Sequence, residues 1–504
     1  MLAPVLRRAL VAAAVLALTL GAAVAQERLV IASTGEADNL DPRVATDVRS
    51  FERISTIFEP LVVFDRGLGL QPRLATGWSF NDDATAITFA LRDDVTFHHG
   101  RPFTAEDVIY TFEWVLDPDN PSLNRPLYTD IEAITAPDPY TVVFELARPN
   151  AFLLNNIARM PIVPADRGEE NDFQVNPSGT GAFAFVSWSR DDAITLRAFE
   201  DYWGGRARVD EVVFRPIPED GTRLLALEAG EVDMYQGGPI GAELPRLEAD
   251  PAIGVDRAPA PAYNFVGFNT RAEPLGDVRV RQAIAHLIPR EGIVERILEG
   301  VGQVGVSMLL PEMPWFEPDI ARYPYDPERA RALLAEAGYP DGGFSVRIYS
   351  DPAPMRTQIA EILLNELIAL GIDATVQAEE SSAVFQRFTQ TEDYEIMVYA
   401  WGGQLDPDRA IFRQFTSGGS AYAYTYWSDP RVDELALRGQ AVAPDSDESV
   451  AIYREIQRII GDEVPYTFVN YIEEVAVYRA DITGWAAHPH SSVTYQDLFL
   501  VGRD

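Results

Sequence analysis

One segment restricts the fold of this chain more than any other, because it predicts two strands joined by a helix. Residues 345–349 and 372–377 have the length and apolar character of strands. Residues 357–370 between them have the apolar spacing of a helix, and Gly371 follows where glycine commonly ends one. A strand, a helix and a strand in this order predict two parallel strands with a crossover helix. The segment therefore indicates an α/β fold.

A second strand–helix–strand unit is predicted earlier in the chain, over residues 211–217, 223–229 and 231–235. Further helices are predicted at residues 277–288 and 327–338. A chain of 504 residues is too long for a single hydrophobic core. We therefore expect two or three domains of α/β type.

Additional strands are predicted outside these two units. They lie at residues 28–33, 86–91, 95–100, 465–470 and 474–478. Thr104 and Asp107 form the capping box of a helix that should continue to Leu116.

The N-terminus has the features of an export signal. Arg7 and Arg8 precede an apolar run over residues 9–22, and the small residues Ala23 and Ala25 fit a cleavage site after Ala25. No later apolar run reaches the length of a membrane span. The chain has no cysteine, which excludes disulfides and a lipid anchor on a cysteine after the signal. We therefore expect a soluble protein of the bacterial periplasm that does not span the membrane.

The chain carries a formal net charge of -36, with 77 acidic residues and no lysine at all. A field of this sign repels nucleic acids and anionic membranes. Either a GC-rich genome or adaptation to salt accounts for such a composition, and the sequence leaves both open. The charge therefore excludes nucleic acid as a partner.

The stretch from Tyr394 to Asp408 is the strongest candidate for a ligand site. A short apolar run, residues 396–400, is followed by Trp401, two glycines and an Asp-Pro pair. Open α/β sheets bind ligands at the carboxyl ends of their strands, and tryptophan offers a flat surface with one donor. A turn with one core tryptophan is the alternative interpretation.

Several motifs, taken together, resemble the family 5 solute-binding proteins of ABC importers. Gln71–Leu116 contains the family's P-x-L-A-x-x-W opening, T-F-x-L-R strand, F-H-x-G turn and T-A-x-D-V helix, in order. Residues 176–188 and 201–203 resemble its N-P-x-G-T-G-P-Y and D-Y-W segments, with Ala182 in place of the usual proline. Residues 268–293 resemble its F-N-T and R-x-A-I segments, with Pro289 in place of aspartate. The resemblance covers nearly the whole mature chain.

The resemblance implies a two-lobe periplasmic-binding-protein fold, type II, of the large class with an extra subdomain in the first lobe. The implied divisions are a signal peptide (1–25), a first lobe (26–69, 175–267 and 471–504), an inserted subdomain (70–174) and a second lobe (268–470). The implied function is capture of a small solute between the lobes and delivery to an inner-membrane ABC permease. We expect a monomer without a cofactor.

The resemblance also implies a set of ligand-binding positions between the lobes. Trp401 stands where the family places an aromatic that stacks on the ligand. Gln404 replaces the aspartate that binds a peptide's free amine in relatives, and Asp406 is a substitute for it two residues later. An amide cannot neutralise an ammonium group, so the sequence favours solutes other than simple di- and tripeptides. An oligopeptide or modified peptide, an oligosaccharide, an opine-like compound and a metal chelate all stay open.

The remaining candidates have structural alternatives. Tyr422 and Tyr424 either line the cleft or form an ordinary strand face. Surface or structural roles are the alternatives for the five others. These are Arg125, Tyr128 and Arg159 in the insert, Arg356 at the start of a second-lobe helix and Glu36 in the first loop.

A secreted carbohydrate-active hydrolase is the alternative function, because Asp406 and Asp408 could imitate a catalytic acid pair. The chain lacks a G-x-S-x-G elbow and a phosphate-binding loop. Its five histidines predict no metal site: His98 and His99 fit structural roles, His286 a packed helix position, and His488 and His490 a surface loop. We therefore expect no enzyme, and ligand binding without turnover would separate the two functions.

Overall fold

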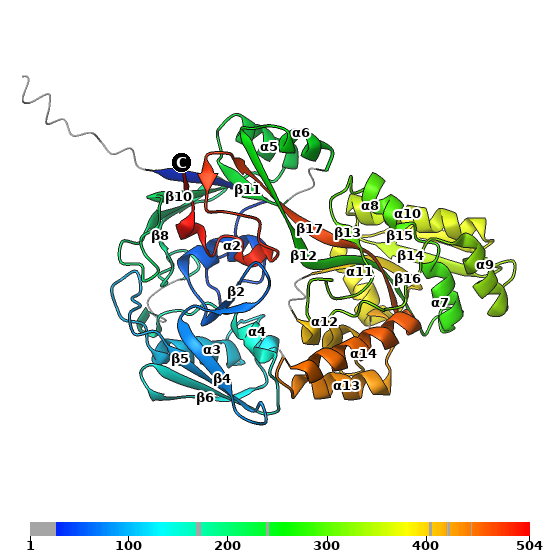
Figure 1. Cartoon of the computed structure of the whole chain (residues 1–504), viewed down its shortest axis with the longest axis horizontal. Helices are drawn as coiled ribbons and strands as arrows, with labels where there is room; N and C mark the ends of the chain where they lie inside the picture. The colour runs from blue at the N-terminus through cyan, green and yellow to red at the C-terminus, as the bar shows by residue number, and fades with distance from the viewer. Residues whose placement is uncertain are drawn as a thin grey trace, which may run out of the picture.

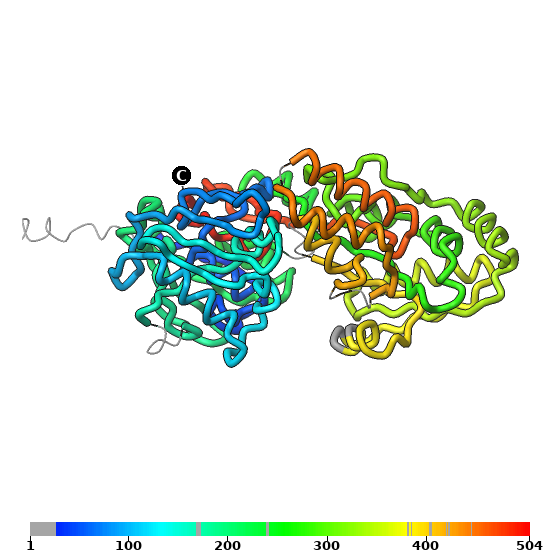
Figure 2. Tube along the Cα trace, turned by 90° about the horizontal axis from the view of Figure 1, so that it is seen from below, coloured from blue at the N-terminus to red at the C-terminus, as the bar shows by residue number. Residues whose placement is uncertain are grey.

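The computed structural model describes residues 27–167, 173–237, 241–402, 406–419, 421, 424–444 and 446–503 (Figures 1 and 2). Figure 1 shows two halves side by side, which we call the first lobe, containing the N- and C-terminal segments, and the second lobe. Figure 2 shows the same two bodies from a perpendicular direction. The α/β class and the two-lobe architecture predicted from the sequence are confirmed.

One mixed sheet runs through both lobes. Its order is β15-β14-β16-β12-β17-β11-β1-β10-β9-β8, with β13 paired to β17. The strands are β1 (Arg28–Ser33), β8 (Phe183–Ser189), β9 (Ala193–Ala198), β10 (Glu211–Pro216), β11 (Met234–Gln236), β12 (Ile253–Phe268), β13 (Gln303–Val304), β14 (Ser345–Ser350), β15 (Asp373–Ala378), β16 (Ile396–Trp401) and β17 (Tyr466–Arg479).

The first lobe contains the earlier of the two predicted crossover units. Helix α5 (Asp220–Glu228) connects β10 to β11, and both strands lie parallel to β1, which is inserted between them. Helix α2 (Val48–Ile57) packs on this sheet and contributes Ile54 and Ile57 to its core. The shorter elements are α6 (Leu244–Glu248), β2 (Val62–Phe64), β3 (Leu70–Pro72), β18 (Ile482–Thr483) and β19 (Gly502–Arg503).

The inserted segment forms a separate four-stranded antiparallel sheet, which we call the insert. Its strands pair in the order β4-β5-β7-β6. The elements are β4 (Ala75–Phe80), β5 (Ala86–Leu91), α3 (Ala105–Leu116), β6 (Ile131–Asp138), β7 (Thr141–Leu146) and α4 (Leu153–Ile157). Thr104 and Asp107 form the predicted capping box of α3. The insert has its own core, in which Phe89, Phe112 and Phe144 meet edge to face.

The predicted strand at residues 95–100 is wrong. An isolated bridge between Thr96 and Pro102 is the only ladder contact of this stretch among the described residues. The backbone N–H of His98 instead donates to the carbonyl of Gly179, at 2.9 Å, and the His98 ring contacts the Gly181 carbonyl at 2.8 Å. Contacts with a distant loop therefore replace the strand pairing that the local sequence predicts.

That loop passes very close to the end of α2. A Cβ atom added to Gly179 would lie 2.0 Å from the carbonyl oxygen of Ile57, and one on Gly181 would lie 2.4 Å from that of Thr56. The N–H of Gly181 donates to Ile57 at 2.9 Å. The two glycines thus permit a backbone-to-backbone contact within the first lobe, and the same loop contacts His98 of the insert.

The second lobe contains the crossover unit predicted at residues 345–377. Strands β14 and β15 are parallel and α10 (Pro354–Ala369) connects them, so this prediction is confirmed. Gly371 has φ +79°, the left-handed conformation expected after the helix. The other helices are α7 (Val278–Ala285), α8 (Arg290–Arg296), α9 (Pro327–Glu336), α11 (Ser381–Gln386), α12 (Pro407–Phe415), α13 (Pro430–Gln440) and α14 (Asp447–Glu463).

Strands β12 and β17 pass together from one lobe to the other (Figure 1). They pair antiparallel along most of their length, with two register shifts. Ala258 and Ala476 lie in the core of the first lobe, and Phe265 and Phe468 lie in a core of the second. The two lobes are therefore connected by a hydrogen-bonded two-strand ribbon.

The two late strands predicted at residues 465–470 and 474–478 are one continuous strand, β17. Glu473 and Glu474 lie where the two predicted strands meet. In the structure the Glu473 carboxylate accepts from Arg257, on the paired strand β12, at 2.9 Å. Glu474 lies within 3.5 Å of the Gln236 amide. Tertiary partners for both carboxylates allow the strand to continue.

Candidate functional site

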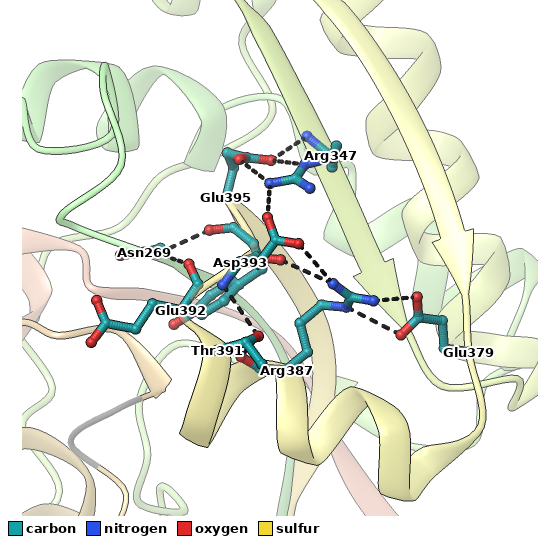
Figure 3. Close-up of polar contacts among 9 residues, drawn as sticks. Asn269, Arg347, Glu379, Arg387, Thr391, Glu392, Asp393 and Glu395 are labelled. Carbon is teal, nitrogen blue, oxygen red and sulfur yellow. Dashed lines mark hydrogen bonds and ion pairs between the residues drawn. The ribbon is translucent and has the colours of Figure 1, made fainter.

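Strand β16 positions Trp401 at the junction of the two lobes. It pairs with β12 on one side and with β14 on the other. Figure 3 shows the ion-pair network at the beginning of this strand: the Arg347 guanidinium contacts the carboxylates of Glu395 and Asp393 at 2.7 Å each, and Asp393 also contacts Arg387 at 3.1 Å. Such a network fixes geometry better than an isolated surface pair does. The strand that ends in Trp401 is thus held at both edges and at its start.

A cavity of about 230 Å³ lies where the lobes and the insert meet the connecting ribbon. Its walls come from α2 and the loop before it, the insert, strand β12, strand β17, the second lobe and the C-terminal segment. The lining residues are Thr46, Val48, Arg159, Ala260, Pro261, Ala262, Gly402, Arg409, Glu474, Pro489, His490, Ser491 and Ser492. We call this space the interlobe cavity.

A second cavity of similar size, about 210 Å³, lies elsewhere and does not meet both lobes. Its walls come from the second lobe alone, and its Arg290 guanidinium already donates to the carbonyls of Phe468 and Tyr323 at 2.6 Å. A ligand there would leave the relative position of the lobes unchanged. The interlobe cavity is therefore the candidate site.

Two arginines line the interlobe cavity, and a third lies on the same helix as one of them. Arg159 comes from the insert, and Arg409 and Arg413 lie four residues apart on α12, which places them on the same helix face. Arg159 Nη1, Arg409 Nε and Arg413 Nε are buried and have no hydrogen-bond partner among the described residues. Buried donors without partners are costly, so such a group indicates a site that a ligand completes.

Burial and mutual repulsion act on these guanidinium groups. Burial lowers the pKa of Arg409 to about 9, and the neighbouring charges of Arg159 and Arg413 lower it further. Burial likewise lowers the pKa of Arg159. Asp406 is the carboxylate that opposes this effect in both cases. The cluster therefore places three guanidinium groups near one opposing carboxylate, Asp406.

Trp401 is 9 % exposed and lies beside this cluster. The Arg413 guanidinium carbon lies 4.9 Å from the centre of the Trp401 ring, and the Tyr424 ring meets it edge to face at 5.2 Å. Trp401 Nε1 is buried without a hydrogen-bond partner in the described part of the chain. Trp401 and Tyr424 are thus largely packed into the second lobe, with one indole donor left available.

Asp406 and Asp408 occupy different environments. The Asp406 carboxylate caps α12 and accepts from the Arg409 backbone N–H at 2.7 Å, and burial raises its pKa. The Asp408 carboxylate accepts from the Gln440 amide at 2.8 Å, and burial, reinforced by the Asp406 charge, raises the pKa of Asp408 to about 7. Neither environment leaves a free pair of carboxylates facing the cavity.

His490 and Glu474 line the cavity from the first-lobe side. Both ring nitrogens of His490 are buried without a hydrogen-bond partner among the described residues, and its side chain is 6 % exposed. Burial lowers its pKa well below the usual range, so the ring is neutral. Burial raises the pKa of Glu474 to about 7. The prediction of a surface loop for His488 and His490 is wrong, because the C-terminal segment folds inward and His488 contacts the Phe64 carbonyl at 3.3 Å.

The structure brings five of the predicted site residues together: Arg159, Trp401, Tyr424, Asp406 and Tyr128. The Tyr128 hydroxyl donates to the Asn156 carbonyl at 2.9 Å, and its ring lies near the Arg159 charge. Gln404 and Tyr422 lie outside the described residues.

Three predicted site residues lie away from the cavity walls and have protein partners. Arg125 donates to the carbonyls of Val115, Asp117 and Asn120 within the insert. Glu36 accepts from the Trp188 indole at 2.8 Å.

Arg356, the third of these residues, makes a two-point ion pair with Asp351, at 2.6 and 2.7 Å.

The sequence analysis did not identify four residues of the site, which are Arg409, Arg413, Glu474 and His490. For Arg409 and Arg413, the sequence signal that could have identified them is their four-residue spacing on a helix that follows Trp401.

The insert also touches the second lobe directly, which closes one side of the site. The Phe152 ring is 2 % exposed and meets the rings of Trp315 and Tyr453 at 6.0 and 5.5 Å. The Ala151 N–H donates to the Gln440 carbonyl at 2.9 Å. We call this contact the insert latch.

Within the described ranges, no group of three or more histidine, aspartate or glutamate side chains is arranged to hold a metal ion. No helix in the same part of the chain is long and apolar enough to cross a membrane.

A cavity walled by both lobes of a hinged α/β fold defines a binding protein that encloses a small solute between its lobes. Residues 69–423 match the model of the bacterial extracellular solute-binding proteins, family 5 (middle region), and the chain belongs to that family. It is therefore the solute-binding component of an ABC importer, which captures a small solute and delivers it to the membrane permease.

The similarity extends over nearly the whole chain. The chain is 26% identical over 519 residues to the dipeptide-binding protein of Escherichia coli, covering 96% of each. It is 28% identical over 484 residues to heme-binding protein A of Haemophilus influenzae, covering 89% of this chain and 87% of that one. The solved structure of HbpA2 from Haemophilus parasuis superposes with a TM-score of 0.85 at 25% identity, covering 95% and 100% of the two chains. These relatives are binding proteins, and nothing among them supports a hydrolase.

Proposed function

We propose that this protein binds a small peptide-like solute in the interlobe cavity and carries it through the periplasm as a monomer, without chemical change. The supporting observation is that the cavity walls come from both lobes, the insert and the connecting ribbon. A solute bound there touches both lobes at once, so binding favours the closed arrangement. Export with cleavage after Ala25 is part of this proposal.

Relatives named for dipeptides and for heme favour different solutes, so the names alone leave a range of ligands. Within that range the size of the cavity, about 230 Å³, favours a solute of a few residues over a long peptide. Trp401, Tyr424, Asp406, Tyr128 and Arg159 are the predicted residues that we propose to contact or surround the solute. The lobe boundaries predicted from the sequence fit the proposal, because the ribbon of β12 and β17 lies at the predicted crossings.

Thermal denaturation with candidate solutes tests this proposal, because a ligand that binds the folded state alone raises Tm. The protein should first be unfolded, dialysed and refolded to remove any solute acquired during expression. A small-molecule extract of bacterial cells and of peptone should then raise Tm, and mass spectrometry of the solute released from the complex should return it unmodified. An extract that leaves Tm unchanged, or a bound solute that is converted to a product, would contradict the proposal.

The variant Trp401→Ala tests the placement of the site. We expect weaker binding of the recovered solute with cooperative folding retained, because the indole lies at the edge of the second-lobe core and keeps a free donor. Trp78→Ala is a matched control, since Trp78 lies in the insert, away from the cavity walls. Equal affinity of Trp401→Ala and the native protein would exclude the proposed position.

A further inference from the structure

The arginine cluster at the interlobe cavity has a composition that the capture of an uncharged or zwitterionic solute does not explain. Arg159, Arg409 and Arg413 bring three guanidinium groups together in a chain whose net charge is -36. No ion pair to a carboxylate side chain is formed by any of them within the described ranges, whereas arginines such as Arg347 and Arg356 are paired. The cluster is thus a local positive field within a strongly acidic protein.

The nearby acidic groups do not cancel this field. Asp406 is occupied as the cap of α12, where it accepts from the Arg409 backbone N–H. Glu474 lies on another wall of the cavity, and burial raises its pKa to about 7, so a large share of it is neutral near that pH. Three guanidinium groups are therefore opposed by two carboxyl groups, Asp406 and Glu474, and burial raises the pKa of both.

Donors from separate parts of the chain meet at the interlobe cavity. Arg159 and Arg409 both line the cavity, from the insert and from the second lobe respectively. Each of the three arginines keeps a buried N–H group without a partner among the described residues, and so does Trp401. His490 adds a neutral ring, 6 % exposed, with both nitrogens unpartnered. Arg159, Arg409 and His490 line one space, and Arg413 and Trp401 contact each other beside it, so an anion placed there would satisfy several unpartnered N–H groups together.

We propose that the solute carries at least two negative charges, as two carboxylates or as a phosphate group, and that Arg159, Arg409 and Arg413 select it. Guanidinium groups are suited to this role because they form two parallel hydrogen bonds with carboxylate or phosphate oxygens. The inference rests on the proposed binding of solute in the interlobe cavity and adds its charge. A solute with two negative charges would also pair with the guanidinium groups that a neutral peptide would leave unpaired.

Two probe anions and one zwitterion test the inference on the stripped protein. Sodium phosphate and sodium succinate represent the two sources of negative charge, and Ala-Ala represents a zwitterionic peptide without net charge. Sodium chloride at equal ionic strength corrects for general salt effects. We expect a saturable rise in Tm of several degrees with phosphate or with succinate, and a smaller one with Ala-Ala. The anion that gives the larger rise identifies the source of the charge.

Variants separate specific binding from general stabilisation. Arg409→Gln and Arg159→Gln should each weaken binding of the effective anion at least about tenfold by calorimetry, because each loses a charge-assisted hydrogen bond. Arg409→Lys should restore part of the affinity. Arg331→Gln, on the exposed face of α9 beside Glu328, is the matched control and should bind like the native protein.

Two results would overturn the inference. One is an absence of any saturable effect of phosphate and succinate beyond chloride. The other is an anion effect that persists unchanged in Arg409→Gln and Arg159→Gln. If Ala-Ala or a neutral solute from the cell extract stabilises the protein in either case, the proposed solute-binding function stands and the proposed charge of the solute fails. If the extract also fails to raise Tm, both proposals fail.

Discussion

Phe152 of the insert latch provides the most direct way to alter closure of the lobes without touching the cavity. Its ring is 2 % exposed and packs against Trp315 and Tyr453 of the second lobe. A buried phenylalanine removes about 150 Å² or more of apolar surface from water, which corresponds to about 4 kcal/mol at 25 cal/mol per Å². The two edge-on aromatic contacts add about 1 kcal/mol.

Only the share of this energy that belongs to the closed arrangement changes the affinity for solute. The Phe152 ring belongs to the core cluster of the second lobe, and we assign about half of its burial energy to closure. The variant Phe152→Ala should then favour the open form by about 2 kcal/mol, which weakens solute binding roughly 30-fold. Calorimetry with the recovered solute measures this change.

The position of the lobes can be followed in the same variant. Because the chain has no cysteine, Leu123→Cys and Leu437→Cys give two unique labelling positions, both exposed, on the insert and on the second lobe. Energy transfer between dyes at these positions should decrease in Phe152→Ala. Phe103→Ala, buried in the insert core, is the control, which should lower Tm and leave energy transfer and affinity unchanged. If Phe152→Ala behaves like Phe103→Ala, the latch is present in both forms and the reasoning is refuted.

Two further changes test other parts of the structure. Burial raises the pKa of Asp408 from 3.8 to about 7, so the contribution of this group to stability is full below pH 3.8 and is lost as the pH rises through 7. The variant Asp408→Asn keeps the acceptor for Gln440. It should increase the free energy of unfolding above pH 7 by up to about 4 kcal/mol, with no difference at pH 4. An equal effect at both pH values in chemical denaturation would contradict this assignment. Gly179→Ala should lower the free energy of unfolding by about 3 kcal/mol, because the added Cβ meets the Ile57 carbonyl. The control Gly77→Ala has open space around the added Cβ and should have little effect. A native-like Tm for Gly179→Ala would show that the loop of Gly179 and the end of α2 can separate at low cost.

The crossover units were predictable from the sequence because their signals are local. The apolar periods of residues 345–377 and the glycine after α10 specify each element without reference to the rest of the chain. The sequence motifs also identified the family and the strand that ends in Trp401. Predictions of this kind depend on neighbours a few residues apart, which the sequence displays directly.

The errors and omissions concern contacts between distant segments. Two separate strands were predicted on either side of residues 471–473, but the ion pair of Glu473 with Arg257 on β12 keeps this segment within the ladder. His490 follows a proline and suggested a surface loop, whereas the C-terminal segment brings it into the cavity. Arg409 and Arg413 look like any exposed pair on a helix, and their lack of partners becomes visible only in three dimensions. Contacts between residues far apart in the sequence determine the positions of these side chains, and the local sequence pattern carries no information about such contacts.

The connecting ribbon has a consequence for the order in which the chain can assemble. Strand β12 offers one edge to β16 and the other to β17, and β17 reaches β11 of the first lobe. The last strand of the main sheet to be synthesised is therefore the one that joins its two halves. Until β17 pairs, β12 keeps an open edge, and Glu474 and His490 are absent from the cavity. A chain that folds from its N-terminus thus acquires its complete binding site only when its C-terminal segment has joined the sheet, so ligand capture requires the completed chain.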